Sequence, residues 1–312
     1  MAVNSDSPEC FPGHDHGAWR PVVAELAASW PAGHFIENLV VRHDGVVFVS
    51  LHSHRRIDRY DPGTGAVVEF AGLPAPVAGL AFDQDGTLWA TGGTLGETPG
   101  YVWRVSSCGA VDEWLQVPDA LFMNGCAIAT GRRSLLACES VTGRIVAVDL
   151  TEPVWESWIS DVLLRPTGGA IPGANGIKLR DGYAWITVTD RNLLLKARIL
   201  EDGRAGPLEP AADQLRADDF AFGKSGAAYL ATHPANTVLR LAGDGTRTTI
   251  AGPAQGAVGS TACAFGRGPG DAGSLYVTTN GGMWSPYHDQ IQDAKLLRLA
   301  VGETGDQTAT RT

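Results

Sequence analysis

The chain has 312 residues, a formal net charge of -10 and no run of Lys or Arg longer than two, which argues against binding to nucleic acid or an anionic membrane. No stretch approaches the roughly 18 apolar residues of a membrane span, and the N-terminus lacks a basic region followed by an apolar one. A soluble cytoplasmic protein is therefore expected.

Cysteine usage excludes two common ways of stabilising a fold. The five cysteines are odd in number, widely spaced and never arranged as CxxC, which argues against a disulfide framework or a structural zinc site. We expect buried free thiols instead. The positions are Cys10, Cys108, Cys126, Cys138 and Cys263.

A repeat of about 45 residues runs through the chain. Six segments each contain a short apolar strand, a turn with Gly, and further β-rich strands. Self-similarity of this length is typical of a propeller or a repeat array. The first strands read ENLVV from residue 37, AGLAF from 78, NGCAI from 124, NGIKL from 175, DDFAF from 218 and TACAF from 261.

Each repeat has three clear strands and a weaker fourth, enough for one four-stranded antiparallel blade. The predicted fold is therefore all-β, a six-bladed β-propeller of four-stranded antiparallel blades in a single domain over residues 19–301. RPVVAELAASW, residues 20–30, is expected to supply the outer strand of the last blade. Residues 1–18 and 302–312 are predicted to be flexible tails.

The innermost strands of a propeller run along its central channel, so the leading residues of the six repeats should form a ring. Four of them carry a carboxylate or an amide: Glu37, Asn124, Asn175 and Asp218. Such a set suits a hard divalent cation, with Ca²⁺ preferred and Mg²⁺, Mn²⁺ or Zn²⁺ as alternatives. Asn-Gly and Asp-Asp also occur as plain turn residues before a strand, but four coincidences in register favour a cation site on the axis.

A second polar layer is expected where the second strands end, and it includes His52, His233 and Asn280. The histidines are candidate ligands, general acids or substrate contacts, or they hydrogen-bond within a polar channel. Trp284 and Tyr287 lie in an insertion before the last strand. They either cover the channel mouth or pack on the edge of a blade.

The ring and its spacing resemble the SMP-30/gluconolactonase family of six-bladed propellers over residues 30 to 300. In that family Glu, Asn, Asn and Asp from separate blades hold the metal, which implies these roles for Glu37, Asn124, Asn175 and Asp218, with Asp218 also catalytic. The stretches GANGIKLRDGYAW, DDFAF and LYVTTNGG resemble a branch found in natural-product pathways. Some members of that branch are reported to guide cyclisations.

Two departures from the family pattern bear on chemistry. Asp218-Asp219 stands where the family has Asp-Gly, and the register favours Asp218 as the inward carboxylate. Phe122 stands where sugar-lactone members carry Arg, so Phe122 and Met123 favour an aromatic or otherwise apolar ligand.

These features predict a metal-dependent hydrolase of a lactone or ester that is not a sugar, with Asp218 as the base. The predicted substrate contacts are Phe122, His52, His233, Asn280, Trp284 and Tyr287. A non-hydrolytic cyclase or isomerase is the main alternative, since orientation alone accelerates a reaction. Two further alternatives are compatible with this fold. One is a binding module without catalysis, and the other is an enzyme that catalyses a condensation like that of strictosidine synthase.

Overall fold

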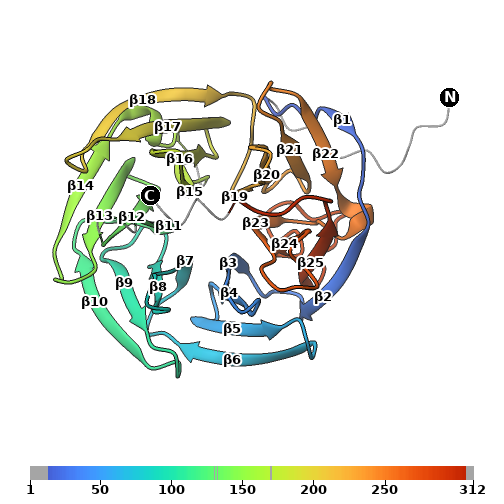
Figure 1. Cartoon of the computed structure of the whole chain (residues 1–312), viewed down its shortest axis with the longest axis horizontal. Coiled ribbons are helices and arrows are strands. Elements are labelled where there is room, and N and C mark those ends of the chain that lie inside the picture. The colour runs from blue at the N-terminus through green and yellow to red at the C-terminus, as the bar shows by residue number, and fades with distance from the viewer. Residues whose placement is uncertain (1–12, 130, 132, 169–170, 307–312) are drawn as a thin grey trace.

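The computed structural model describes residues 13–129, 131, 133–168 and 171–306, and in this part of the chain the strands form six sheets around one axis (Figure 1). The first blade contains β3 (Ile36–Val41), β4 (Val47–Leu51), β5 (Arg56–Asp61) and β6 (Ala66–Gly72). The second contains β7 (Val77–Phe82), β8 (Leu88–Gly92), β9 (Gly100–Val105) and β10 (Val111–Val117). The third contains β11 (Met123–Ala129), β12 (Ser134–Glu139), β13 (Arg144–Asp149) and β14 (Trp155–Ser160).

The remaining blades repeat this arrangement. The fourth contains β15 (Ala174–Arg180), β16 (Tyr183–Val188), β17 (Leu193–Ile199) and β18 (Ala205–Ala212). The fifth contains β19 (Phe220–Phe222), β20 (Ala228–Ala231), β21 (Val238–Leu241) and β22 (Arg247–Ala251). The sixth contains β23 (Ser260–Phe265), β24 (Ser274–Thr279), β25 (Ala294–Ala300) and β2 (Ala24–Trp30). The predicted six-bladed β-propeller is confirmed.

The ring closes because the sixth blade combines the two ends of the domain. β2 pairs antiparallel with β25, with Ala24 opposite Leu299 and Trp30 opposite Ala294. The prediction that the stretch 20–30 completes the last blade is confirmed for Ala24–Trp30, whereas Arg20 and Val22 donate to Thr249 O and Ile250 O of the fifth blade. Since the outermost strand comes from the start of the chain, opening the ring requires this whole ladder to separate.

Residues that precede β2 and residues that follow β25 also contact the propeller. β1 (Ala18–Trp19) adds to the fifth blade in parallel with β22, and Asp15 N donates to Gln214 O. Near the other end, Glu303 accepts a hydrogen bond from Tyr229 Oη. The rest of the predicted tails, residues 1–12 and 307–312, lies outside the described residues. The flexibility of the tails stays a prediction.

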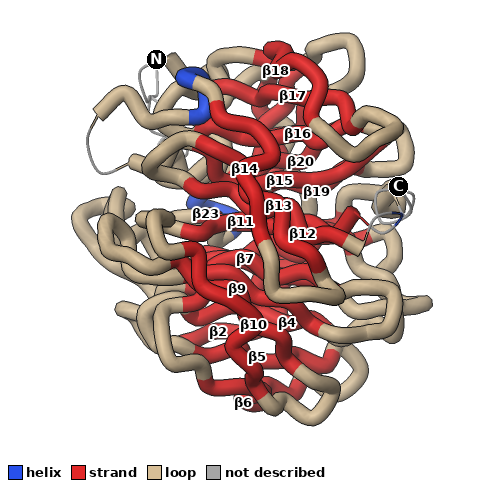
Figure 2. The backbone as a smooth tube through the Cα atoms, turned by 90° about the vertical axis from the view of Figure 1, so that its left-hand side faces the viewer, coloured by secondary structure: helices blue, strands red, loops and turns tan. Residues whose placement is uncertain are grey.

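Loops gather on the two faces of the disk, as the side view shows (Figure 2). Helical structure in the described part is limited to short 3₁₀ turns such as η2 (Val162–Leu164) and η3 (Pro253–Gln255). No helix among the described residues is long and apolar enough to cross a membrane.

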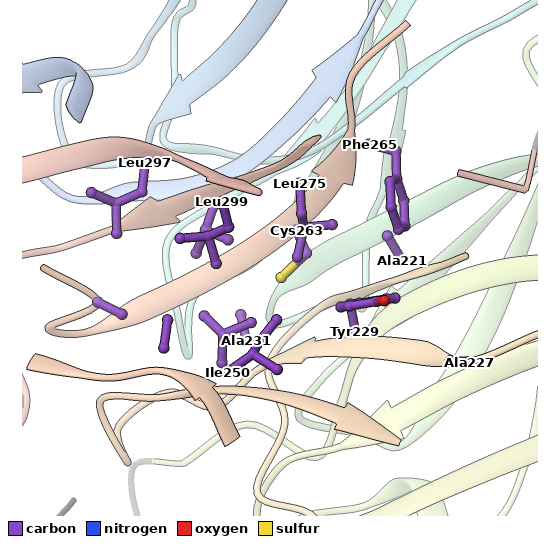
Figure 3. Close-up of a cluster of buried hydrophobic side chains, with 14 residues drawn as sticks. Ala221, Ala227, Tyr229, Ala231, Ile250, Cys263, Phe265, Leu275, Leu297 and Leu299 are labelled. Atoms are coloured by element: carbon purple, nitrogen blue, oxygen red, sulfur yellow. The ribbon is translucent and has the colours of Figure 1, made fainter. Parts of the chain in front are cut away.

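The apolar core lies between neighbouring blades, because a sheet buries both faces when it is stacked against others. Figure 3 shows one such layer, in which Cys263 and Leu275 of the sixth blade face Ala231 and Ile250 of the fifth. Cys126, Cys138 and Cys263 are buried free thiols, as predicted. Cys108 is an exposed free thiol and corrects the expectation for that position, whereas Cys10 lies outside the described residues.

Candidate functional site

The innermost strands share an irregularity at the level of the predicted ring. The ladders to the second strands shift register between Ile36 and Asn38, between Met123 and Cys126, and between Ala174 and Ile177. A bulge leaves a residue out of the regular alternation and re-aims its side chain. Glu37, Asn124 and Asn175 occupy these bulges, and Asp218 lies two residues before β19, the innermost strand of the fifth blade.

Glycine follows both asparagines because the inner strands approach one another closely. A Cβ on Gly125 would lie 2.5 Å from Asn175 O, and one on Gly176 would lie 2.4 Å from Asp219 Oδ1. Both Asn-Gly pairs lie inside β11 and β15 rather than in turns. The interpretation of these pairs as turn residues is therefore wrong. Glycine follows each asparagine because a Cβ there would collide with the neighbouring blade.

Hydrogen bonds determine which way the two amides point. Asn124 Nδ2 donates to Ser140 Oγ at 3.3 Å, and Asn175 Nδ2 donates to Thr189 Oγ1 at 2.9 Å. Each hydroxyl gives its single proton to a backbone carbonyl of the next blade, at 2.6 and 2.7 Å. The hydroxyl oxygens can only accept from the amides, so the Oδ1 atoms remain available as ligands.

Glu37 is buried, with 6% of its surface exposed, and its Oε2 has no hydrogen-bond partner. Burial, and secondly the Asp218 carboxylate, raise the pKa of Glu37 well above its ordinary value. Glu139 is fully buried but accepts from the backbone N–H groups of residues 121, 122, 141 and 142. An unpartnered buried carboxylate is costly, so Glu37 lacks the structural explanation that Glu139 has.

The adjacent aspartates have different partners. Asp219 accepts from Lys178 Nζ at 2.6 and 2.7 Å and from Asn38 Nδ2 at 3.1 Å, so its charge is compensated. Asp218 Oδ2 lies 3.4 Å from His233 Nδ1, and the Asn175 side chain is close enough to favour the ionised form of Asp218. Burial, and secondly Asp219, raise the pKa of Asp218 well above its ordinary value. Asp218 is thus the carboxylate associated with Glu37 and Asn175.

Aromatic rings form a row that links the two predicted histidines. Ring centroids lie 5.6 Å apart for Phe122 and His52, 5.7 Å for His52 and Phe35, and 6.1 Å for Phe35 and His233. Sequence reasoning missed Phe35, which stands two residues before Glu37 and has no polar group to draw notice. The row offers an apolar surface beside a polar ring, which is the usual composition of a small-molecule site.

The histidines of this row are held by different nitrogens. His52 Nδ1 lies 3.1 Å from Val77 O, and since a carbonyl only accepts, this nitrogen carries the proton. His233 Nε2 lies 2.9 Å from Asn280 Nδ2. Burial lowers the pKa of both rings, to about 4 for His233, so both are neutral at pH 7.

The other predicted substrate contacts lie in different surroundings. Asn280 is fully buried, so it reaches a ligand only through His233. Trp284 is 57% exposed, and the ring of Tyr287 contacts that of His288 at 4.1 Å. A role for Trp284 and Tyr287 at the channel mouth stays a prediction.

A cavity of about 590 Å³ lies at the other end of the inner strands. Leu39, Leu80, Ile128 and Phe222 line it together with Lys178. None of the four predicted ligand residues borders this space, which is separated from Asp218 by the Lys178–Asp219 pair. This cavity is therefore not the predicted cation site, despite its volume.

The four candidate donors have the chemistry that a hard divalent cation prefers. Among the described residues no three His, Cys, Asp or Glu side chains form a ligand cluster, and two of the four candidate donors here are amides. The orphaned Oε2 of Glu37, the free amide oxygens and the Asp218 carboxylate are all hard donors in a buried place. They fit a hard divalent cation better than a soft one.

The fold and this ring define the class of the protein as a six-bladed propeller with oxygen donors on its axis. No family model matches the chain. A curated relative from Phoma sp bears the name "Putative hetero-Diels-Alderase" and is 24% identical over 312 residues, covering 83% of this chain and 87% of the relative.

Solved structures with the same fold are similar along almost the whole chain. A calcium-binding regucalcin from Agrobacterium tumefaciens is 16% identical, covers 93% of this chain and 97% of its own, and has a TM-score of 0.70. A luciferin-regenerating enzyme is 13% identical, covers 91% and 97%, and scores 0.72. A gluconolactonase from Xanthomonas campestris is 13% identical, covers 92% and 98%, and scores 0.62. The expected likeness is thereby confirmed at the level of the fold.

Proposed function

We propose that this protein is an enzyme that hydrolyses a lactone or ester of a partly apolar substrate, with a divalent cation held by Glu37, Asn124, Asn175 and Asp218. The observation that carries the proposal is the buried Oε2 of Glu37, which has no hydrogen-bond partner, while the Asp218 carboxylate is close enough to raise the pKa of Glu37. The calcium-binding regucalcin and the gluconolactonase share the fold and support both parts of the proposal.

A divalent cation, when bound, polarises the substrate carbonyl and stabilises the oxyanion that develops on it. The chain supplies the remaining chemistry. Asp218 takes a proton from water as the water oxygen bonds to the carbonyl carbon, and the proton then passes to the alkoxide that leaves when the ester C–O bond breaks.

Substrate selection is assigned to the aromatic row. Phe122 and Phe35 supply apolar faces on either side of His52, and the lone pair of His52 lies on Nε2 because Nδ1 is protonated. This surface suits an aromatic or alkyl-substituted lactone. It offers no cation for a polyhydroxylated sugar acid, in line with Phe122 at the position of the family's Arg.

A second candidate function is a cycloaddition or other cyclisation without water. The aromatic row favours it, because flat apolar faces can hold a reactive intermediate in one orientation. The Phoma relative named as a hetero-Diels-Alderase adds support over most of the chain.

One experiment distinguishes the two candidates. The purified protein is analysed for bound metal and then incubated in H₂¹⁸O with a panel of aryl and alkyl lactones and with a conjugated polyene intermediate. Hydrolysis predicts one ¹⁸O atom in the product and loss of turnover with a chelator or in Asp218→Asn. A product of unchanged mass without ¹⁸O favours cyclisation instead, and full hydrolytic activity in Asp218→Asn would refute the first proposal.

A further inference from the structure

The amide of Asn280 is oriented without ambiguity by two backbone groups. Its Oδ1 accepts from Gly282 N at 2.9 Å and from Met283 N at 3.2 Å. A backbone N–H can only donate, so the atom facing them is the oxygen. The atom that faces His233 Nε2 at 2.9 Å is therefore the amide nitrogen, which donates to the ring.

The surroundings of Asn280 leave it little freedom to turn. The side chain is fully buried, and a Cβ on Gly259 would lie 1.9 Å from its Oδ1. Gly259 itself has a φ of +67°, and its N–H donates to Asn236 Oδ1 at 2.6 Å. Packing and hydrogen bonds thus hold the amide in one orientation.

The orientation of Asn280 determines the protonation site of His233. A ring nitrogen that accepts a hydrogen bond carries no proton, and an imidazolium has no acceptor at all. With Nε2 accepting, the ring is neutral and its only proton lies on Nδ1. That nitrogen is 3.4 Å from Asp218 Oδ2.

We propose that Asn280 is a positioning residue, which fixes His233 as the Nδ1–H tautomer and so directs a neutral N–H at Asp218. This inference rests on the proposed role of Asp218 as ligand and base. One carboxylate oxygen then faces an N–H, and the other remains for the cation and the attacking water. In the opposite tautomer a lone pair would face the carboxylate and turn it away.

The contact between the Asn280 amide and the His233 ring joins the fifth blade to the sixth. His233 follows β20 of the fifth blade and Asn280 follows β24 of the sixth. In the third and fourth blades the equivalent positions hold hydroxyls that orient the asparagines of the ring, Ser140 for Asn124 and Thr189 for Asn175. A carboxylate needs a donor rather than an acceptor beside it, so an imidazole with a fixed N–H replaces the hydroxyl in the fifth blade.

The decisive variant is Asn280→Asp. It keeps an oxygen for the N–H groups of residues 282 and 283 but replaces the donor to His233 by an acceptor. The ¹⁵N signals of His233 are recorded in cation-free protein and identified by their absence in His233→Asn. We expect a pyridine-type, unprotonated Nε2 in the wild type and a protonated Nε2 in Asn280→Asp.

Asn236→Asp is the matched control, because Asn236 is also buried and adjacent but contacts Gly259 and Ser285 rather than the ring. It adds the same charge and should leave the signals of His233 unchanged. Lactone hydrolysis in Asn280→Asp should fall about 10-fold or more in kcat relative to this control, with KM nearly unchanged.

The effect of Asn280→Asp in the His233→Asn variant tests whether Asn280 acts through the imidazole of His233. His233→Asn places an amide N–H near the position of Nδ1 and has no tautomer to choose. Adding Asn280→Asp to His233→Asn should then change kcat by less than about twofold, well short of the effect expected of the coupling in the wild type.

A protonated Nε2 in the wild type, or an unprotonated Nε2 in Asn280→Asp, would overturn the tautomer assignment. Unchanged kcat despite the tautomer shift would overturn the positioning role while leaving the hydrolase proposal intact. If the wild type hydrolyses no lactone, the proposed function fails, whereas the inference on His233 is still decided by its nitrogen signals.

Discussion

Replacing Glu37 by Gln tests the proposed assignment of Glu37 as a ligand, because it removes the charge of the side chain and keeps its shape. Cation-free Glu37→Gln should be as stable as the wild type or up to about 2 kcal/mol more stable, since an unpartnered buried carboxylate is lost. A cation at 100 times its Kd should stabilise the wild type by about 2.7 kcal/mol and Glu37→Gln much less.

The size of the thermal effect follows from chain length. With about 2.1 cal/mol/K of unfolding entropy per residue, a chain of 312 residues gives about 0.66 kcal/mol/K. The wild type should therefore gain about 4 °C in Tm on adding saturating Ca²⁺, and Glu37→Gln should gain about 1 °C or less. Scanning calorimetry with and without a chelator measures both increments.

Glu139→Gln is the control, since Glu139 is also buried but is satisfied by backbone N–H groups. It should cost about 1–3 kcal/mol with or without the cation, because some of those donors lose their acceptor. Its Ca²⁺ increment in Tm should equal that of the wild type. An equal increment in Glu37→Gln would refute the assignment of Glu37 as a ligand.

Three further predictions concern the same axis. The pKa values of Glu37 and Asp218 are raised in the folded state, so the cation-free protein loses stability as pH rises above about 4. The increase in Tm on adding Ca²⁺ should therefore be larger at pH 8 than at pH 5. An equal increase at the two pH values would contradict this prediction. Asp219→Asn should destabilise the protein by about 1–3 kcal/mol in urea titrations, because Lys178 loses its carboxylate partner. Gly176→Ala should cost at least about 1–3 kcal/mol because its Cβ would collide with Asp219, whereas the control Gly243→Ala, where a Cβ meets open space, should change stability by less than about 0.5 kcal/mol.

Local regularities made most of the fold predictable. The repeat of apolar strand, Gly turn and β-rich strand appears six times, and each copy folds into one blade at the expected place. The same register predicts one level for Glu37, Asn124, Asn175 and Asp218, because equivalent positions of inner strands must face a common axis. The structure adds bulges at Glu37, Asn124 and Asn175 and close glycine approaches after both asparagines.

Contacts between blades were beyond sequence reasoning. Lys178 pairs with Asp219 across 41 positions, and Asn280 meets His233 across 47, so neither partner is visible from a local pattern. Glu37 and Glu139 also look alike in the sequence, because each is a glutamate next to apolar strand residues. Only their hydrogen-bond partners separate a structural carboxylate from a candidate ligand.

The charges near the axis support the choice of a divalent cation independently of the ligand types. Glu37, Asp218 and Asp219 interact with one another and supply three negative charges. Lys178 compensates one of them, and His233 is neutral because its Nε2 accepts a hydrogen bond. Two uncompensated charges remain in a buried place, where like charges repel strongly. Two protons or one divalent cation can balance them, and only the cation leaves Asp218 ionised to act as a base.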